Sequence, residues 1–255
     1  MIVCKSPAEL ERMRAANALV ADVLAELAGM VAPGITTQDL DAAAEKLVRD
    51  GGAEPAFKGY RGYPSTLCAS VNEQVVHGIP SNRSLGEGDI ISLDMGVKLN
   101  GFYGDSAVTV PVGKVSDEAA TLLRITRESL EKGIAQVRLG GRISDIGHAI
   151  QQHVEAHGFS VVREFVGHGI GAALHEEPQI ANYGEPGRGP RLAEGMTLAI
   201  EPMVNVGRPA VKVLADGWTA VTKDGSLSAH FEHTVAVTKT GPLVLTRRSV
   251  PAPAA

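Results

Sequence analysis

Apolar residues recur at helical spacing near the N-terminus and predict a helix there. The stripe consists of Leu10, Met13, Val20, Val23, Leu24 and Leu27. Residues three and four apart share one face of a helix, so this spacing indicates a helix that buries one side. Ser6 precedes the stripe as an N-cap, with Pro7 in the first turn and Glu9 placed to bond back to the cap. Gly29 is expected to end the helix.

The same periodicity predicts three more helices. One begins at Thr36 or Thr37 and runs to about Arg49, before a pair of glycines that stops it. The others are predicted over residues 116–137 and 144–157, and each begins at a serine that can cap the first turn. A pair of helices therefore stands in each half of the chain.

Alternating and continuous apolar runs predict strands. The clearest is a hairpin, in which residues 89–99 and 102–110 are strand-like and Asn100-Gly101 is a two-residue turn. Short strand-like runs are also expected within residues 53–80. Further strands are predicted near residues 160–166, 196–201 and 234–238. The glycine- and proline-rich segment 181–191 is predicted to be a loop.

Two segments 107 residues apart are similar. Residues 85–94 are LGEGDIISLD and residues 192–201 are LAEGMTLAIE, and both end in a carboxylate. The same offset pairs Gly34 with Gly141, Thr37 with Ser144, Ala42 with Ala149 and Gly51 with Gly158. A Glu-Gly turn before an apolar strand also arises by chance, but register shared across helices and strands favours an internal repeat.

The simplest fold that fits is one α+β domain over residues 1–250, with helices packed on one side of a mostly antiparallel sheet. Its two similar halves span about 1–112 and 113–250. The repeat predicts that the halves face each other across one site. The last residues, 251–255, are predicted to be a disordered tail.

Composition narrows the class of protein. The 255 residues are 44% hydrophobic and carry a formal net charge of -5. A nucleic-acid-binding surface needs a basic patch, so DNA is not an expected partner. The N-terminus does not resemble a secretory signal, and acidic residues interrupt the apolar stretch 18–32, so no membrane span is predicted. Cys4 and Cys68 are expected to be free thiols, which indicates a cytoplasmic location.

The predicted hairpin brings two aspartates together. If Asn100 and Gly101 form the turn, Gly96 lies opposite Asp105. Asp94 is then on the same face of the sheet as Asp105. Such diagonal neighbours are roughly 7 Å apart at the backbone. Two carboxylates that lose hydration there repel each other and need a cation or a shared proton. The alternative is that one of them only caps a turn.

Three side chains downstream are further candidate ligands. His168 lies between glycines in VGHGIG, Glu201 ends the second repeat, and Glu232 begins an alternating strand. Singly, a histidine is more often structural and a glutamate at a strand end is usually solvated. Together with the aspartates they form a carboxylate-rich set that suits Mn, Fe(II), Co or Zn. Four carboxylates exceed what one ion uses, which suggests two metal ions with bridging acids.

The sequence resembles the methionine aminopeptidase family in the order of five ligands: Asp94, Asp105, His168, Glu201 and Glu232. The surrounding segments match as well: NEQVVHGIP, DMGVKLNGFYGD, GHGIG, IEPM and FEHT. The resemblance covers nearly the whole chain. The chain has no long insertion before the last ligands and no N-terminal zinc-binding extension, which is typical of the bacterial type I form. The fold implied is the pseudo-two-fold "pita-bread" fold.

The resemblance implies a role for each ligand. Asp94 would hold one metal ion, and Asp105 and Glu232 would bridge both. His168 and Glu201 would complete the second site. The implied activity is removal of the N-terminal methionine from nascent proteins and peptides. The two ions lower the pKa of a bridging water, and the resulting hydroxide attacks the first peptide bond.

His77 and His175 match the active-site histidines of the family that are not ligands. Each can donate a hydrogen bond to developing charge, an effect worth about 3 kcal/mol. Glu201 would also carry a proton to the leaving nitrogen. On the residues alone, His77 is a histidine in a loop and His175 is a surface or helix-end residue, so their roles depend on the resemblance.

The resemblance assigns the methionine side chain of the substrate to a pocket formed by Tyr60, Tyr63, Cys68 and Trp218. Sulfur against aromatic edges is a favourable contact, which suits a thioether. The alternative is that the tyrosines anchor a loop and the tryptophan lies at a rim. Phe57 stands where the family often has a cysteine, and Leu174 where it often has an aromatic residue. The pocket shape and the substrate range are therefore open.

The resemblance also implies partners. The substrate is the N-terminus of a peptide or nascent chain, with a small second residue. Transient contact with the ribosome and a monomeric state are expected. A monovalent cation site is implied near Asn72, Gln74 and Ser228.

Three other functions fit parts of the sequence. A prolidase or aminopeptidase P of the same fold would use similar ligands, but those enzymes usually carry a large N-terminal domain, and only about ninety residues precede Asp94. A non-catalytic relative that binds ribosomes or nucleic acid would need neither the intact ligand set nor its spacing, and a basic patch would be expected. The third is an α+β domain with scattered surface acids.

Overall fold

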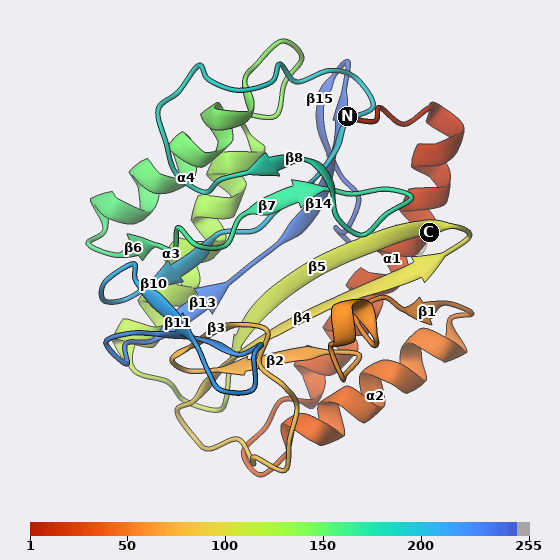
Figure 1. Cartoon of the computed structure of the whole chain (residues 1–255). Coiled ribbons are helices and arrows are strands. Elements are labelled where there is room, and N and C mark those ends of the chain that lie inside the picture. The colour runs from red at the N-terminus through yellow and green to blue at the C-terminus, as the bar shows by residue number, and fades with distance from the viewer. Residues whose placement is uncertain (249–255) are drawn as a thin grey trace, which may run out of the picture.

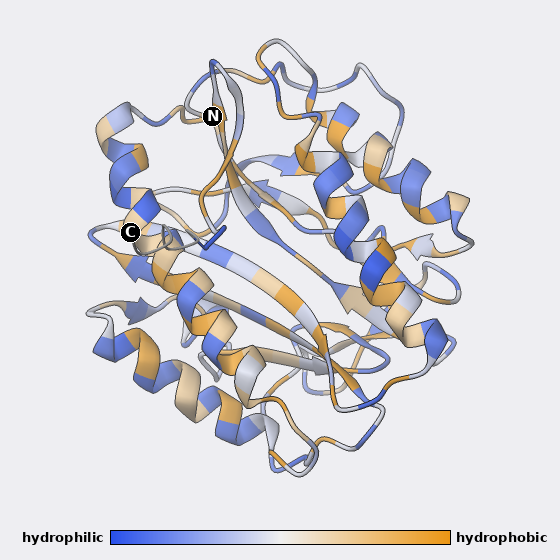
Figure 2. Ribbon diagram, turned by 180° about the vertical axis from the view of Figure 1, so that it is seen from behind, coloured by the Kyte–Doolittle hydropathy of each residue, from blue (hydrophilic) through white to orange (hydrophobic). Residues whose placement is uncertain are grey.

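The structure, a computed structural model, describes residues 1–248. The helices lie together on one side of the strands, and a long hairpin crosses the middle of the molecule (Figures 1 and 2). The α-helices are α1 (Pro7–Met30), α2 (Thr37–Asp50), α3 (Asp117–Ile134) and α4 (Ile143–Ala156). The expected α+β class, with helices on one side, is confirmed. The predicted tail, 251–255, lies outside the described residues.

The two N-terminal helices begin at the predicted caps. The Ser6 hydroxyl accepts from the Glu9 N–H, and the Glu9 carboxylate accepts from the Ser6 N–H. Thr36 and Asp39 form the same reciprocal pair at the start of α2. Each pair satisfies two N–H groups that the helix leaves without a partner. Among the described residues, no helix has the length and apolar character that a bilayer crossing requires.

The start of α4 differs from the prediction. Arg142 is the cap residue and the helix begins at Ile143, so Ser144 is already inside the first turn. The Asp145 carboxylate accepts from the Arg142 N–H and satisfies the helix start. The Ser144 hydroxyl instead accepts from the N–H of Arg188 and ties α4 to the loop predicted at 181–191.

Two other predicted boundaries are also wrong. The helix predicted to reach Val137 ends at Ile134, because the N–H groups of Gln136 and Val137 bond only three residues back, as in tight turns. The strand expected over 160–166 is only β6 (Ser160–Val161). Its partner, β10, is itself three residues long, so the ladder cannot continue, and residues 162–166 form a loop.

The strands form four antiparallel sheets within the described residues. The first sheet contains β1 (Glu54–Pro55), β2 (Cys68–Val71), β4 (Ile90–Leu99) and β5 (Phe102–Pro111). In this sheet β4 lies between β1 and β2, and β5 also pairs with β4. A second sheet has the order β15-β14-β9-β7-β8, with β7 (Gly167–Gly169), β8 (Glu176–Ile180), β9 (Thr197–Ile200), β14 (His233–Thr238) and β15 (Gly241–Val244).

The two smaller sheets and a short helix complete the fold. One sheet contains β6, β10 (Met203–Asn205) and β13 (Ser228–His230). The other contains β3 (Gln74–Val76), β11 (Val211–Val213) and β12 (Ala220–Thr222). A 3-10 helix, η1 (Tyr60–Gly62), lies before β2. The sheet of β6, β10 and β13 packs against α3 and α4 in the core of the second half.

The hairpin decides which side chains face the site. Its register places Gly96 opposite Asp105, as predicted. Asn100 and Gly101 have φ of 52° and 81°, the left-handed conformation of a tight hairpin turn. Alternate residues of β4 pack in the core with α1 and α2: Ile91, Leu93, Met95 and Val97. Because neighbouring strand residues point to opposite faces, Asp94 points away from the helices.

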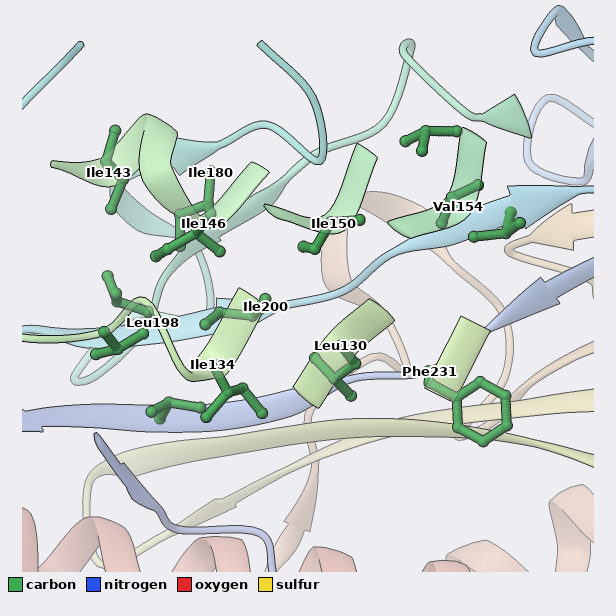
Figure 3. Packing of buried hydrophobic residues seen from close by; sticks show 14 of the residues in the cluster. Leu130, Ile134, Ile143, Ile146, Ile150, Val154, Ile180, Leu198, Ile200 and Phe231 are labelled. Carbon is green, nitrogen blue, oxygen red and sulfur yellow. The ribbon is translucent and has the colours of Figure 1, made fainter. Parts of the chain in front are cut away.

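Each pair of helices packs on the strands of its own half. Figure 3 shows the core of the second half, where α3 and α4 lie over β9. Its labelled side chains include Leu130, Ile134, Ile146, Ile150, Leu198 and Ile200. Full burial of each such side chain stabilises the fold by about 1.5–3 kcal/mol. Packing of this kind fixes the strand ends that carry the site.

Lys5 ties the N-terminal segment to the loop before β8. Its ammonium group forms an ion pair with Glu176 that is almost completely buried, and its N–H donates to the carbonyl of Gly195. The Glu176 carboxylate also accepts from the N–H of Ala173, in the loop that carries His175. The ion pair therefore supports the position of a candidate site residue.

We expect Lys5→Met to lower the free energy of unfolding by about 3 kcal/mol, because it leaves the Glu176 charge buried without its partner. Urea unfolding followed by circular dichroism measures this change. Lys239→Met removes an exposed ion pair with Glu194 and is the matched control. Its effect should stay below about 0.5 kcal/mol. Equal effects of the two substitutions would contradict the role of Lys5.

Candidate metal centre and substrate pocket

One pocket collects the predicted site residues, on the side of the strands away from the α-helices. It is a cavity of about 190 Å³, and no described residue of an α-helix lines it. All of the candidate ligands line it: Asp94, Asp105, His168, Glu201 and Glu232. So do the candidate histidines and the candidate methionine-pocket residues: His77, His175, Phe57, Tyr60, Tyr63, Cys68, Leu174 and Trp218.

The two aspartates come from the two strands of the hairpin. Asp94 pairs with Ala107 on β5 and with Cys68 on β2, so Asp105 is its diagonal neighbour. Both aspartates are buried, and each has one carboxylate oxygen with no hydrogen-bond partner among the described residues. Burial and the nearby charge of Asp105 raise the pKa of Asp94. Burial raises the pKa of Asp105 to about 7.

The two glutamates sit at strand ends beside β5. Glu201 directly follows β9, and Pro202 comes next. Glu232 precedes β14, its N–H donates to the carbonyl of Ala107 at 2.9 Å, and its own carbonyl accepts from the Ser106 hydroxyl at 2.6 Å. These bonds fix Glu232 next to the aspartates. Burial, and then the charges of the neighbouring carboxylates, raise the pKa of both glutamates.

His168 enters the cluster where the backbone of β7 is crowded on both sides. A Cβ atom on Gly167 would lie 2.3 Å from the carbonyl oxygen of Ala199. A Cβ atom on Gly169 would lie 2.2 Å from the carbonyl oxygen of Glu177. Only glycine fits at both positions, so the glycines of the VGHGIG segment are needed to bring the histidine between its neighbouring strands.

Hydrogen bonding determines which ring nitrogen of His168 faces the acids. Its Nδ1 lies 2.9 Å from the carbonyl oxygen of Gly169, which places the proton on Nδ1. Nε2 therefore presents a lone pair, 3.5 Å from Glu201 Oε1 and 3.8 Å from Asp105 Oδ2. Burial lowers the pKa of His168 to about 4, so the ring is neutral near pH 7.

These residues fit a divalent metal centre. Ligand atoms of Asp105, His168 and Glu232 all lie within 4.8 Å of one another. A lone pair aimed at carboxylates, and buried carboxylate oxygens without partners, are unfavourable unless a cation lies between them. Carboxylate oxygen together with imidazole nitrogen is a donor set that divalent transition metals favour. Asp94 and Glu201 line the same cavity and extend this set.

His77 lies immediately after β3 with its side chain in the pocket. Its φ of 60° is uncommon for a residue other than glycine, and it turns the ring toward the cavity. The ring makes edge-on contacts with Phe165 and Trp218, with centroids 5.4 Å and 6.2 Å away. Burial lowers the pKa of His77 to about 4, so it too is a neutral side chain.

His175 lines the pocket beside His168. Its ring centroid is 4.2 Å from that of His168. Its Nδ1 is 2.9 Å from the Tyr60 hydroxyl, and the two rings stack. Burial and the nearby Arg61 lower the pKa of His175. The contact with Tyr60 fixes the ring so that Nε2 is free for another partner.

The remaining wall of the pocket is aromatic and apolar. The Tyr63 hydroxyl lies 3.0 Å from the carbonyl oxygens of Leu67 and Gly78, and its ring packs edge-on against Trp218 at 5.1 Å. The Cys68 thiol is buried, which raises its pKa and keeps it protonated. The wall therefore combines aromatic edges with an uncharged sulfur.

Comparison with known proteins identifies the family. Residues 11–239 match the model of the family described as metallopeptidase family M24. This chain belongs to metallopeptidase family M24. Methionine aminopeptidase 1 of Bacillus subtilis (strain 168) is 57% identical to it over 247 residues, which cover 97% of this chain and 100% of that protein.

Solved M24 structures agree with the fold. The crystal structure of methionine aminopeptidase from Thermotoga maritima has a TM-score of 0.96 and 49% identity, and covers 97% of this chain and 100% of the other. The prolidase from Pyrococcus furiosus has a TM-score of 0.79 at 21% identity, and covers 97% of this chain but 66% of the prolidase. The second likeness shows the pita-bread fold alone.

Several residues that line the pocket of this M24 chain were not predicted from the sequence: Arg61, Val76, Phe165, Val166 and Met203. Arg61 lies inside the GYRGY segment, and Met203 ends the IEPM segment, so both stood next to residues that were singled out. Phe165 and Val166 were assigned to a strand. They lie in a loop because β6 stops pairing before it reaches them. The sequence pattern does not show where this pairing ends.

The residues expected near a monovalent cation lie together at one turn. Asn72 has φ of 55°, and its carbonyl accepts from the N–H of Ser228 at 2.9 Å. Its side-chain amide donates to Asp89 at 2.8 Å. The Gln74 side chain bonds the N–H of Val71 at 2.8 Å. The bond between Ser228 and Asn72 places β13 beside the turn that joins β2 and β3.

Proposed function

We propose that this M24 peptidase removes the N-terminal methionine from peptides and nascent proteins whose second residue is small. The observation that carries the proposal is the convergence of the five candidate ligands, in family order, on one cavity with an aromatic wall. The similarity to methionine aminopeptidases over nearly the full length of both chains supports it.

We assign the ligands as follows. Asp94 would hold one metal ion, and Asp105 and Glu232 would be shared between two ions. His168 and Glu201 would hold the second ion. Two divalent ions of the Mn, Fe(II), Co or Zn type would supply Lewis acidity and activate water near neutral pH. The compact grouping of Asp105, His168 and Glu232 supports bridging at this point.

The protein side chains orient the peptide and move the proton. His175, with Nδ1 held by Tyr60, can donate from Nε2 to the carbonyl oxygen of the scissile bond. His77 approaches from the opposite wall and can hold the next carbonyl group. Glu201 has one oxygen toward the centre and can pass a proton to the leaving nitrogen.

The methionine side chain would occupy the space between Tyr60, Tyr63, Cys68, Trp218, Phe57 and Leu174. The edge of Trp218 and the protonated Cys68 are favourable neighbours for a thioether. Phe57, which lies beside Gly96, is larger than the cysteine often found there and takes up space on the apolar side of the cavity. Leu174, which is buried, is smaller than the aromatic residue often found there and leaves space on that side.

The remaining features of the proposal concern organisation and partners. The catalytic domain spans 1–250 as two similar halves, about 1–112 and 113–250, and the presence of one pair of long helices in each half supports this. A monovalent cation binds near Asn72, Gln74 and Ser228. The enzyme acts in the cytoplasm as a monomer, with transient contact to the ribosome.

Steady-state kinetics on short peptides test the function. With added Mn²⁺ or Co²⁺, Met-Ala-Ser should be cleaved at least about 10-fold more efficiently than an Ala-Pro peptide, since a pocket contact of this size changes kcat/KM by that much or more. Met-Leu-Ser is the control for the second residue and should be a poor substrate. Preference for the Ala-Pro peptide would assign the chain to the prolidase branch instead.

We expect His77→Ala to lower kcat by about 100-fold while metal content stays unchanged, because the ring contacts the substrate and not the ligands. Single-turnover rates and metal analysis measure both quantities. His77→Asn is the matched variant, since asparagine tolerates a positive φ and retains a donor. It should recover part of the rate. Loss of metal in His77→Ala would contradict the role assigned to His77.

A further inference from the structure

His230 is a buried histidine next to the centre that has no part in the reaction just described. It ends β13 and is 1% exposed. Its N–H donates to the Thr109 hydroxyl at 2.8 Å, and its carbonyl accepts from the same hydroxyl at 2.7 Å. These two bonds hold the backbone of His230 against β5, and the complete burial of the side chain leaves its ring little room to turn.

Neither ring nitrogen of His230 has a hydrogen-bond partner among the described residues. Buried polar atoms are almost always paired, so a fully enclosed imidazole without a partner requires an explanation. The acceptor that faces it is Glu201 Oε2, 3.8 Å from His230 Nε2. The other oxygen of Glu201, Oε1, lies 3.5 Å from His168 Nε2.

The Glu201 carboxylate therefore stands between two imidazoles and presents one oxygen to each. His168 is on the side of the candidate metal centre, and His230 is on the side of the core. The separation of 3.8 Å is longer than a hydrogen bond, so a bond between these atoms requires the Glu201 side chain to move toward His230. Hydrogen bonds of this kind commonly tighten when a site is filled.

We propose that His230 is a positioning residue for the metal centre: its Nε2–H donates to Glu201 Oε2 and holds Oε1 toward the metal ions. The inference rests on the proposed function, because it gives Glu201 the role of ligand. His230 does not line the cavity, so it acts through Glu201 and not on the substrate. Outer hydrogen bonds orient ligand carboxylates in this way in many metal sites.

The test compares two substitutions at this position. His230→Leu removes the donor at similar volume, whereas His230→Gln retains an N–H donor. Titration with Mn²⁺ alone should show about 10- to 100-fold weaker binding for His230→Leu, the usual effect of losing such a partner. Its kcat on Met-Ala-Ser should fall by a similar factor with KM unchanged. His230→Gln should be close to the unmodified protein in both.

His233→Leu is the matched control. It also removes a buried imidazole, but one that bonds the Thr246 hydroxyl at 2.8 Å and does not line the cavity. It should lower the thermal midpoint while Mn²⁺ affinity and kcat stay unchanged. If His230→Leu does not fold, His230→Met provides a flexible side chain without a donor.

Unchanged Mn²⁺ affinity in the donor-free variant would overturn the inference, and so would equal losses in His230→Leu and His230→Gln. The affinity measurement needs no substrate. Failure of the unmodified protein to cleave Met-Ala-Ser would therefore defeat the proposed function and leave the result on His230 intact.

Discussion

Asp105→Asn should abolish peptide hydrolysis, with kcat/KM lower by more than about 10³-fold, or roughly 4 kcal/mol of transition-state stabilisation. The reason is the position of Asp105, which shares the tightest group of ligand atoms with His168 and Glu232. A neutral amide in that position cannot bridge two cations. Glu232→Gln should have the same effect, and metal analysis should find reduced metal in both variants.

Glu128→Gln is the matched control for the loss of a carboxylate. Glu128 lies on α3, far from the cavity, and pairs with Arg124 and His153. Its substitution should leave hydrolysis unchanged. Full activity of Asp105→Asn or of Glu232→Gln, in the presence of the metal, would overturn the assignment of bridging ligands.

Removal of metal by a chelator should abolish activity and lower the thermal midpoint by about 5–10 °C. Bound metal at 100 times its Kd stabilises a protein by about 2.7 kcal/mol. One kcal/mol corresponds to about 2–4 °C in a domain of this size. Without cations, the buried carboxylates around Asp105 repel one another. This repulsion is present only in the folded state and therefore lowers the free energy of unfolding.

The Asp105→Asn variant serves as the internal control for this measurement. It should show a smaller drop on chelation, since it binds metal poorly and has lost one of the repelling charges. Calorimetric scans with and without EDTA give both values, and added Mn²⁺ should restore the midpoint of the unmodified protein. An identical midpoint with and without metal would show that the cluster is not a metal centre.

Much of the fold followed from local patterns. The capping pairs at Ser6 and Thr36 set the starts of α1 and α2, because they satisfy N–H groups that only neighbours in sequence can reach. The Asn100-Gly101 turn fixed the hairpin register, since both residues accept positive φ. With the register fixed, alternation alone put Asp94 and Asp105 on one face.

Predictions failed where a distant partner decided the outcome. Ser144 was expected to cap α4, but its hydroxyl bonds the backbone of Arg188, a contact across 44 residues. The strand expected over 160–166 stops early because its partner β10 is short. Hydrophobic pattern shows which residues can pair, and it does not show how far the partner strand extends.

Some features of the candidate site were also predictable from the sequence, and others depend on the tertiary structure. The five ligands, the two histidines and the methionine pocket were all named from the sequence by resemblance to a family, and the structure places them around one cavity. Their chemistry as metal donors follows from residue type. The burial of these side chains, which makes the cluster unfavourable without cations, does not follow from residue type. It depends on strands from both halves of the chain.

The sequence by itself determined the α+β class, the helix starts of the first half and the hairpin register, because these depend on short-range spacing. It also indicated the candidate ligands, through residue type and the resemblance to a family. Only the tertiary structure decided that His168 presents Nε2 to the acids and that His230 faces Glu201 from behind. Those relations join residues brought together by packing, and no local pattern encodes the distance between them.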